Sequence, residues 1–230
     1  KYVTSKVCYH RTCMKEKLER IASIDLIRGY FLFVILVDHF GRNFSIYDLF
    51  TGGGQQWVSA AEGFFFVSGL MIGLVRGRKL VDLPFRVTLK KIWQRAGQLY
   101  LWAIGLTIFF TLIAQLFIDN PGLKSGAFYN EPIGKFLLYT ITLRYNYGWA
   151  DFLNYYAIYQ FFTPLALWFL RIKKWYILLA TCFVIWVFGQ NLQFTWQLLF
   201  FSGTITGFYL PEIEHWFTKT LPHHIRRYLY

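Results

Sequence analysis

The sequence is poor in charged side chains. Only 16% of its 230 residues are Asp, Glu, Lys or Arg, whereas soluble domains carry about 25%. So few charges cannot coat a globule of this size in water. By contrast, 56% of the residues are hydrophobic and 22% are aromatic, and the apolar residues fall in long blocks. This composition excludes an ordinary soluble domain and predicts an all-α membrane protein.

Cysteine is also scarce. Cys8 and Cys13 flank His10 near the start of the sequence, and Cys182 lies inside an apolar block. Cys8, His10 and Cys13 lack a fourth ligand and the spacing of a zinc site, so we expect free thiols and no bound metal. Residues 1–20 also lack the apolar core of a signal peptide, and we interpret them as a basic cytoplasmic tail.

Acidic residues are outnumbered by basic ones, 12 to 24, which gives a net charge of +12. Such an excess is common in nucleic-acid-binding proteins. Here the basic residues lie at the ends of apolar blocks, as the positive-inside rule requires, so we expect a lipid bilayer as partner and no nucleic acid. The basic clusters are Lys15, Lys17 and Arg20; Arg76, Arg78 and Lys79; Arg86, Lys90, Lys91 and Arg95; Arg171, Lys173 and Lys174; and Arg226 and Arg227.

Six apolar blocks are candidates for crossing the roughly 30 Å hydrocarbon layer. Between the third and fourth, Ile133–Tyr145 is short for a span and contains Lys135 and Arg144, which favours a re-entrant or interfacial helix. If that segment does not span, every major basic cluster and the N-terminus face the cytoplasm. The predicted blocks run from about Ile21 to Phe40, Trp57 to Val75, Ala96 to Ile118, Phe152 to Leu170, Trp175 to Gln190, and Phe194 to Leu210.

The predicted fold is therefore a polytopic transmembrane helix bundle, with about six spans and one short helix. Its organisation is a basic cytoplasmic tail (1–20), a membrane domain (21–210) and a second cytoplasmic tail (211–230). Pro211 is expected to close the last span, because proline cannot continue the hydrogen-bond pattern of a helix.

Ionisable residues within predicted spans are few, and the first span holds Asp25, Arg28, Asp38 and His39. Arg28 and His39 are separated by eleven positions, which at about 100° per residue brings them within about 20° of one helix face. Asp25 precedes Arg28 by about one turn. Such residues in a membrane indicate a functional site. The alternative is an ion pair at the membrane boundary, with a hydrated histidine at the far interface.

The second span contains Glu62 and Ser68. A carboxylate in lipid is costly unless it is paired or faces a hydrated cavity, so Glu62 strengthens the functional interpretation. Gly63, Gly69 and Gly73 are expected to let the first two helices approach closely. Histidine is the side chain best suited to proton transfer near neutral pH.

These segments resemble the OpgC family, which belongs to a wider group of membrane acyltransferases that includes acyltransferase family 3. Residues 23–30 and 37–40 resemble the first helix of OpgC proteins, and Arg28 and His39 match the group's arginine–x10–histidine motif. Residues 59–69 resemble the family's Ala-Glu-x-Phe-x-Phe-x-Ser-Gly segment. Residues 194–203 resemble its Trp-Gln-Leu-Leu-Phe-x-x-Gly helix, and residues 154–164 fit a span containing tyrosine and proline. These motifs occur in the same order as in the family, and they extend over nearly the whole chain.

The resemblance implies a multi-pass enzyme of the bacterial inner membrane. It would move a succinyl or acetyl group from cytoplasmic acyl-CoA to hydroxyls of a periplasmic glucan or surface polysaccharide, with succinyl-CoA or acetyl-CoA as donor. His39 would be the general base or a transient acyl carrier, and Arg28 would bind the donor or maintain the electrostatics of the site. Asp25, Asp38 and Glu62 would orient these two side chains, with Ser68 nearby.

Family members usually have more spans than six, so the resemblance also implies either that the sequence is an N-terminal portion or that the protein is a reduced form that needs a partner. Two other interpretations remain open. A solute transporter would use the charges within the membrane to line a solute path, and it should show broken helices or internal repeats. A non-catalytic or truncated membrane subunit would keep the architecture without the chemistry.

Overall fold

The computed structural model describes residues 22–37, 59–77, 85–117, 132–148, 151–189 and 192–220. All regular secondary structure in these ranges is helical, which confirms the predicted all-α class. The chain divides into two compact units. The first contains Lys1–Asp82 and Phe169–Tyr230, and the second contains Leu83–Trp168.

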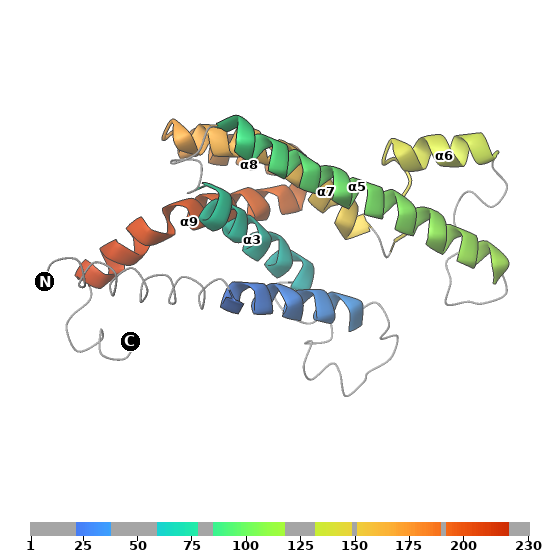
Figure 1. The fold of residues 1–230 in the computed structure, drawn as a ribbon, viewed down its shortest axis with the longest axis horizontal. Helices are drawn as coiled ribbons and strands as arrows, with labels where there is room; N and C mark the ends of the chain where they lie inside the picture. Colours follow the sequence, from blue (N-terminus) through green and yellow to red (C-terminus); the bar gives the residue numbers. More distant parts are fainter. Residues whose placement is uncertain are drawn as a thin grey trace, which may run out of the picture. The chain divides into compact units, whose positions relative to one another are not determined.

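The first unit contains the opening helix of residues 22–37 and α3 (Ala60–Ile72), which continues as one π-helical turn, η1 (Gly73–Gly77). Later in the chain it contains α8 (Trp175–Phe188) and α9 (Leu192–Thr220). Figure 1 shows α3 and α9 lying side by side although they are far apart in the sequence.

Glycines on both helices bring α3 and α9 together. Gly69 of α3 and Gly73 at the start of η1 lie one turn apart, and Gly203 and Gly207 lie one turn apart on α9. A Cβ atom on Gly69 would clash with the carbonyl oxygen of Phe200, and one on each of the other three would also meet backbone of the opposite helix. The pair is therefore a close small-residue crossing of the kind that membrane helices use.

This packing corrects one prediction from the sequence. Gly69 and Gly73 were expected to face the first helix, but they face α9. Only Gly63 of the predicted three meets the opening helix, where the ring of Phe31 occupies the space that a Cβ would need. A glycine pattern predicts a close helix contact, but it does not say which helix makes the contact.

The last helix also differs from the prediction, because α9 does not end at Leu210. It continues through Pro211 to Thr220, so much of the predicted tail is helical. Proline removes one backbone hydrogen bond and bends a helix, but flanking residues can continue the helix on both sides. The ribbon of α9 bends along its length (Figure 1).

The second unit contains α5 (Phe85–Leu116), α6 (Ile133–Ile141) and most of α7 (Asp151–Arg171). The α5 helix begins eleven residues before the predicted block at Ala96, and its first turns carry the basic cluster. Lys, Arg and Gln are good helix formers. Hydropathy predicted an apolar helix here but not where the helix begins. Its buried residues recur every three or four positions: Thr88, Ile92, Ala96, Leu99, Ala103, Thr107, Thr111 and Ala114.

The segment between the third and fourth predicted spans forms a short helix, as expected. At nine residues, α6 is about 13 Å long and cannot cross a bilayer. Its end is tied to α5, because the hydroxyl of Tyr100 donates to the carbonyl oxygen of Ile141 at 2.7 Å. Whether the helix is re-entrant or interfacial stays a prediction.

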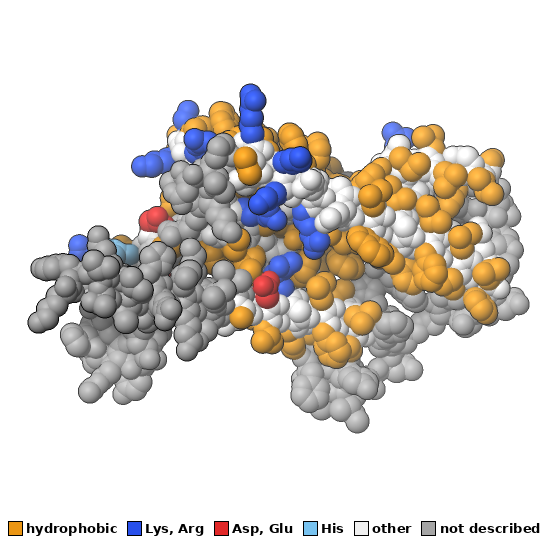
Figure 2. All heavy atoms as spheres, in the orientation of Figure 1, with side chains coloured by type: hydrophobic (Ala, Val, Ile, Leu, Met, Phe, Trp, Pro, Cys, Tyr) orange, Lys and Arg blue, Asp and Glu red, His pale blue; other side chains and the backbone are white. Residues whose placement is uncertain are grey.

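Two helices in the described ranges are long and apolar enough to cross a membrane. These are Ala60–Gly77, which joins α3 and η1, and Phe85–Leu116. The α8 helix, Trp175–Phe188, is apolar but shorter. Apolar side chains cover much of the surface visible in Figure 2. The count of six spans therefore stays a prediction.

Candidate functional site

The candidate site in the first unit is built around Arg28 on the opening helix. Its Nη1 atom donates to Oδ1 of Asp25 at 3.2 Å, one turn earlier. The guanidinium carbon lies 6.0 Å from the centroid of the Phe64 ring on α3. The side chain of Arg28 is 24% exposed and that of Asp25 is 54% exposed. Arg28 is thus held between a carboxylate of its own helix and an aromatic ring of the next.

The Nε atom of Arg28 is buried and has no hydrogen-bond partner among the residues that the structure describes. A guanidinium presents five N–H donors in a fixed plane, suited to carboxylate and phosphate oxygens. Leaving a buried donor unpaired costs about 1–3 kcal/mol, and such atoms gather where a ligand or ordered water completes the site. Arg28 therefore has the capacity to bind an anionic group beside its contact with Asp25.

Ser68 adds a second buried polar atom to the same unit. Its side chain is 1% exposed, and within the described part of the chain Oγ has no hydrogen-bond partner. Ser68 lies one turn beyond Phe64 on α3, and residues four apart share a side of a helix. Ser68 and Phe64 therefore lie on the same side of α3. Ser68 was predicted as a supporting residue, a role that stays a prediction.

Glu62 takes part in the start of α3, and its predicted role in orienting Arg28 or His39 stays a prediction. Its Oε2 atom accepts from the backbone N–H of Ser59 at 2.8 Å, and its own N–H donates to Oγ of Ser59 at 3.3 Å. This reciprocal capping box begins α3. Asp25, and not Glu62, is the carboxylate that contacts Arg28. The signal was present in the sequence, because Ser-x-x-Glu before an apolar run is the capping-box pattern.

Asp38 and His39 lie outside the described residues. The structure therefore confirms the pairing of Asp25 with Arg28, but the common face of Arg28 and His39 stays a prediction.

Phe64 is a site residue that the sequence analysis missed. It is 3% exposed and contributes the ring over which the guanidinium lies. The available signal was the run of three phenylalanines after Glu62, but aromatic residues in membrane helices are usually explained by packing. Only the packing of the opening helix on α3 selects Phe64 from that run.

The residues of the late Trp-Gln segment hold the helices of the first unit together. The Trp196 ring lies 5.1 Å from that of Phe65 on α3. Nε2 of Gln197 donates to the backbone carbonyl oxygen of Cys182 on α8 at 2.7 Å. Where water is absent, a hydrogen bond from a side-chain amide of one helix to another helix stabilises their packing. This segment therefore links α9 to both α3 and α8, and thereby supports the helix that carries Phe64.

A separate polar set lies on α7 in the second unit. Nδ2 of Asn154 donates to Oδ1 of Asn146 at 2.8 Å, and Asn154 is 1% exposed. Its own Oδ1 and the Oε1 of Gln160 are buried and have no hydrogen-bond partners in the described ranges. Unpaired buried amide oxygens can accept hydrogen bonds from hydroxyl groups. This set is a second candidate for polar ligand contacts.

Comparison with known proteins identifies a family. The family model described as OpgC protein matches residues 20–224, which include Arg28, His39, Glu62, Ser68 and the Trp-Gln segment. No curated protein matches the chain, and no solved structure does.

Proposed function

The chain belongs to the OpgC family, and on that premise we propose that it is a membrane O-acyltransferase. It moves a succinyl or acetyl group from acyl-CoA at the cytoplasmic side of the inner membrane to a hydroxyl of a periplasmic glucan or surface polysaccharide. The observation that carries the proposal is the oriented, partly unpaired guanidinium of Arg28.

Arg28 binds an anionic oxygen of the donor in this proposal. Asp25 fixes the guanidinium from one side and the Phe64 ring from another, while Nε remains for the ligand. A charged hydrogen bond of this kind is worth about 1.5–3 kcal/mol. The carboxylate of a succinyl group, a phosphate of CoA and the developing oxyanion of the thioester all have the required chemistry.

His39 acts as the general base in this proposal. It takes the proton of a sugar hydroxyl while that oxygen forms a bond with the acyl carbon. The carbon–sulfur bond of the thioester then breaks, and the proton passes to the CoA thiolate. A positioned base accelerates such a step by about 10²–10⁴-fold. In the alternative order, His39 first carries the acyl group and then transfers it to the hydroxyl.

The test measures acyl esters on cell glycans with the intact protein in its membrane. Arg28→Ala should lower the transfer rate about ten- to a hundred-fold, because one charged contact is lost. Arg28→Lys should recover only part of the rate, since lysine lacks the planar fork. His39→Ala should lower it about 10²–10⁴-fold. Arg144→Ala, an exposed arginine of the second unit, is the matched control and should leave transfer unchanged.

Unchanged acylation in correctly inserted Arg28→Ala protein would refute the role of Arg28. Absence of transfer by the unaltered protein, with donor and glycan present, would instead favour a non-catalytic subunit. The transporter alternative predicts solute uptake that is lost in the same variants.

A further inference from the structure

The basic first turns of α5 form an open hollow of about 520 Å³ outside the site described above. It is lined by Arg86, Leu89, Lys90, Trp93 and Gln94. The whole α5 helix contains no acidic residue. We propose that this hollow binds the headgroup of an anionic phospholipid such as phosphatidylglycerol. The inference does not depend on the acyltransferase activity.

The length of α5 places the hollow at the level of lipid headgroups. Its 32 residues measure about 48 Å, whereas about 20 residues cross the hydrocarbon layer. Residues 96–116 contain no charged side chain and fill that layer. Residues 85–95 then extend beyond it. Figure 2 shows Lys and Arg side chains gathered over the beginning of α5 and apolar side chains over the remainder.

The lining residues match the parts of such a lipid. Arg86 and Lys90 are exposed and one turn apart, so two cations face the same side and can both contact one phosphodiester. Gln94 continues that side by another turn, and its amide can bond the glycerol hydroxyls of the headgroup. Leu89 and Trp93 supply apolar surface for the first part of an acyl chain.

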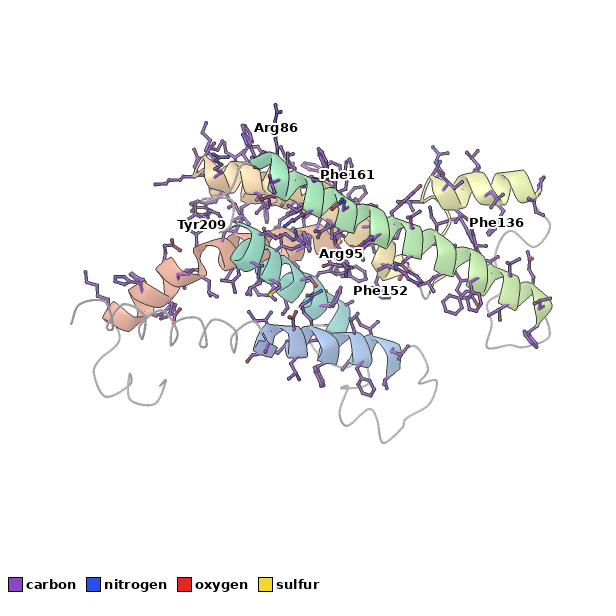
Figure 3. The ribbon with its side chains drawn as sticks, in the orientation of Figure 1. Arg86, Arg95, Phe136, Phe152, Phe161 and Tyr209 are labelled. Carbon is purple, nitrogen blue, oxygen red and sulfur yellow. The ribbon has the colours of Figure 1, made fainter. Side chains whose placement is uncertain are left out.

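Trp93 is held in place by α7. Its Nε1 atom donates to the carbonyl oxygen of Phe161 at 3.4 Å, and the two rings are stacked with centroids 6.4 Å apart. Figure 3 labels Arg86 near the start of α5 and Phe161 beside the same helix. Tryptophan is enriched at the boundary between hydrocarbon and headgroups. The wall of the hollow is therefore fixed by tertiary contact, whereas the cations at its edge are free to reach a phosphate.

The same stretch of helix provides a matched control. Lys91 and Arg95 are also exposed and one turn apart, but neither lines the hollow. At about 100° per residue, Lys91 lies about 140° around the helix from Arg86. Neutralising this second pair removes the same charge from nearly the same membrane depth. General attraction to an anionic surface predicts equal effects for the two pairs, whereas a site in the hollow predicts unequal effects.

The experiment uses the full chain, purified in detergent and stripped of lipid. Native mass spectrometry then measures retention of added phosphatidylglycerol and of phosphatidylcholine. The unaltered protein should retain phosphatidylglycerol preferentially. The double variant Arg86→Gln/Lys90→Gln should bind it about thirty-fold more weakly, and Lys91→Gln/Arg95→Gln should bind it nearly as well as the unaltered protein.

Three results would overturn the proposal: no preference for phosphatidylglycerol, equal losses in the two double variants, or no loss in Arg86→Gln/Lys90→Gln. A separate measurement adds free CoA as competitor. Displacement of the lipid by CoA would assign the hollow to the phosphates of a soluble ligand and also contradict the proposal. Lipid retention that is insensitive to CoA supports it.

Discussion

Arg28 is stabilised by contacts that are individually modest. A partly exposed ion pair contributes about 0–1 kcal/mol, and a cation over an aromatic ring adds about 0.5–1 kcal/mol. The contacts with Asp25 and Phe64 therefore fix the direction of the guanidinium more than they stabilise the fold. A buried Nε without a partner among the described residues lowers the stability of the fold. The proposed binding of the donor at this atom explains why such an arrangement is kept.

At the residue scale, substitutions of Ser59 measure how much the capping box stabilises the protein without changing Glu62 itself. Ser59→Ala removes the acceptor for the Glu62 backbone N–H and should lower the free energy of unfolding by about 0.5–2 kcal/mol. Ser59→Asp keeps an acceptor at the N-cap and should retain stability. Thermal unfolding of the purified protein in detergent measures both. Equal stability of the alanine variant and the unaltered protein would show that the cap contributes nothing.

Glu62→Gln extends this test to function. Glutamine can still accept from the Ser59 backbone N–H, so both stability and acyl transfer should be close to those of the unaltered protein. The measurement is glycan acylation at matched protein levels. A large loss of transfer with unchanged unfolding would show that the charge of Glu62 acts in the chemistry, as the sequence alone suggested.

At the element scale, the α3–α9 contact is the tightest feature of the first unit. Gly69→Ala places a methyl group against the Phe200 carbonyl, which is backbone and cannot rotate away. The helices must separate, and the free energy of unfolding should fall by about 1–3 kcal/mol. Unfolding in detergent measures the change.

Gly105 on α5 is the matched control for Gly69. A Cβ there has no neighbouring atom within 4 Å. Gly105→Ala should be neutral or stabilising by up to about 1 kcal/mol, because alanine is the better helix former. If the two variants unfold alike, the close crossing of α3 and α9 is wrong.

The elements also show which helix boundaries a sequence can predict. Block four was predicted at Phe152–Leu170, and α7 spans Asp151–Arg171. That helix ends where Lys173 adopts a positive φ of 57° and the N–H of Lys174 donates to the carbonyl oxygen of Phe169 at 2.9 Å. The start of α5 and the end of α9 were predicted wrongly, because hydropathy indicates only the apolar part of a helix. A helix can continue beyond that part with polar residues, as α5 does, or through a proline, as α9 does.

At the scale of the whole molecule, the predicted topology can be tested by cysteine labelling. In a background without Cys8, Cys13 and Cys182, the variants Lys173→Cys and Lys219→Cys should react with an impermeant maleimide only after the cytoplasmic side is opened. Pro132→Cys, before α6, should react from the periplasmic side. These positions are exposed, so reactivity reports sidedness.

Labelling of Lys173→Cys from the periplasmic side would contradict the six-span arrangement. It would indicate that Ile133–Tyr145 contributes a crossing. The nine helical residues of α6 make that result unexpected, since they are too few to cross the hydrocarbon layer.

The sequence by itself predicted a membrane environment and identified the family. The scarcity of charge and the apolar blocks predict a membrane protein, because the hydropathy of a segment does not depend on which helices are its neighbours. The arginine, the second-span segment and the Trp-Gln segment identified the OpgC family in the same way. Asp25 was placed beside Arg28 because helical periodicity acts within one element.

Only the tertiary structure decided which helices meet. It paired Gly69 with Phe200 of α9 and set Phe64 under Arg28. The physical reason is that contacts between distant segments depend on the packing of complementary surfaces. Periodicity along one helix shows which residues share a face, but not what covers that face.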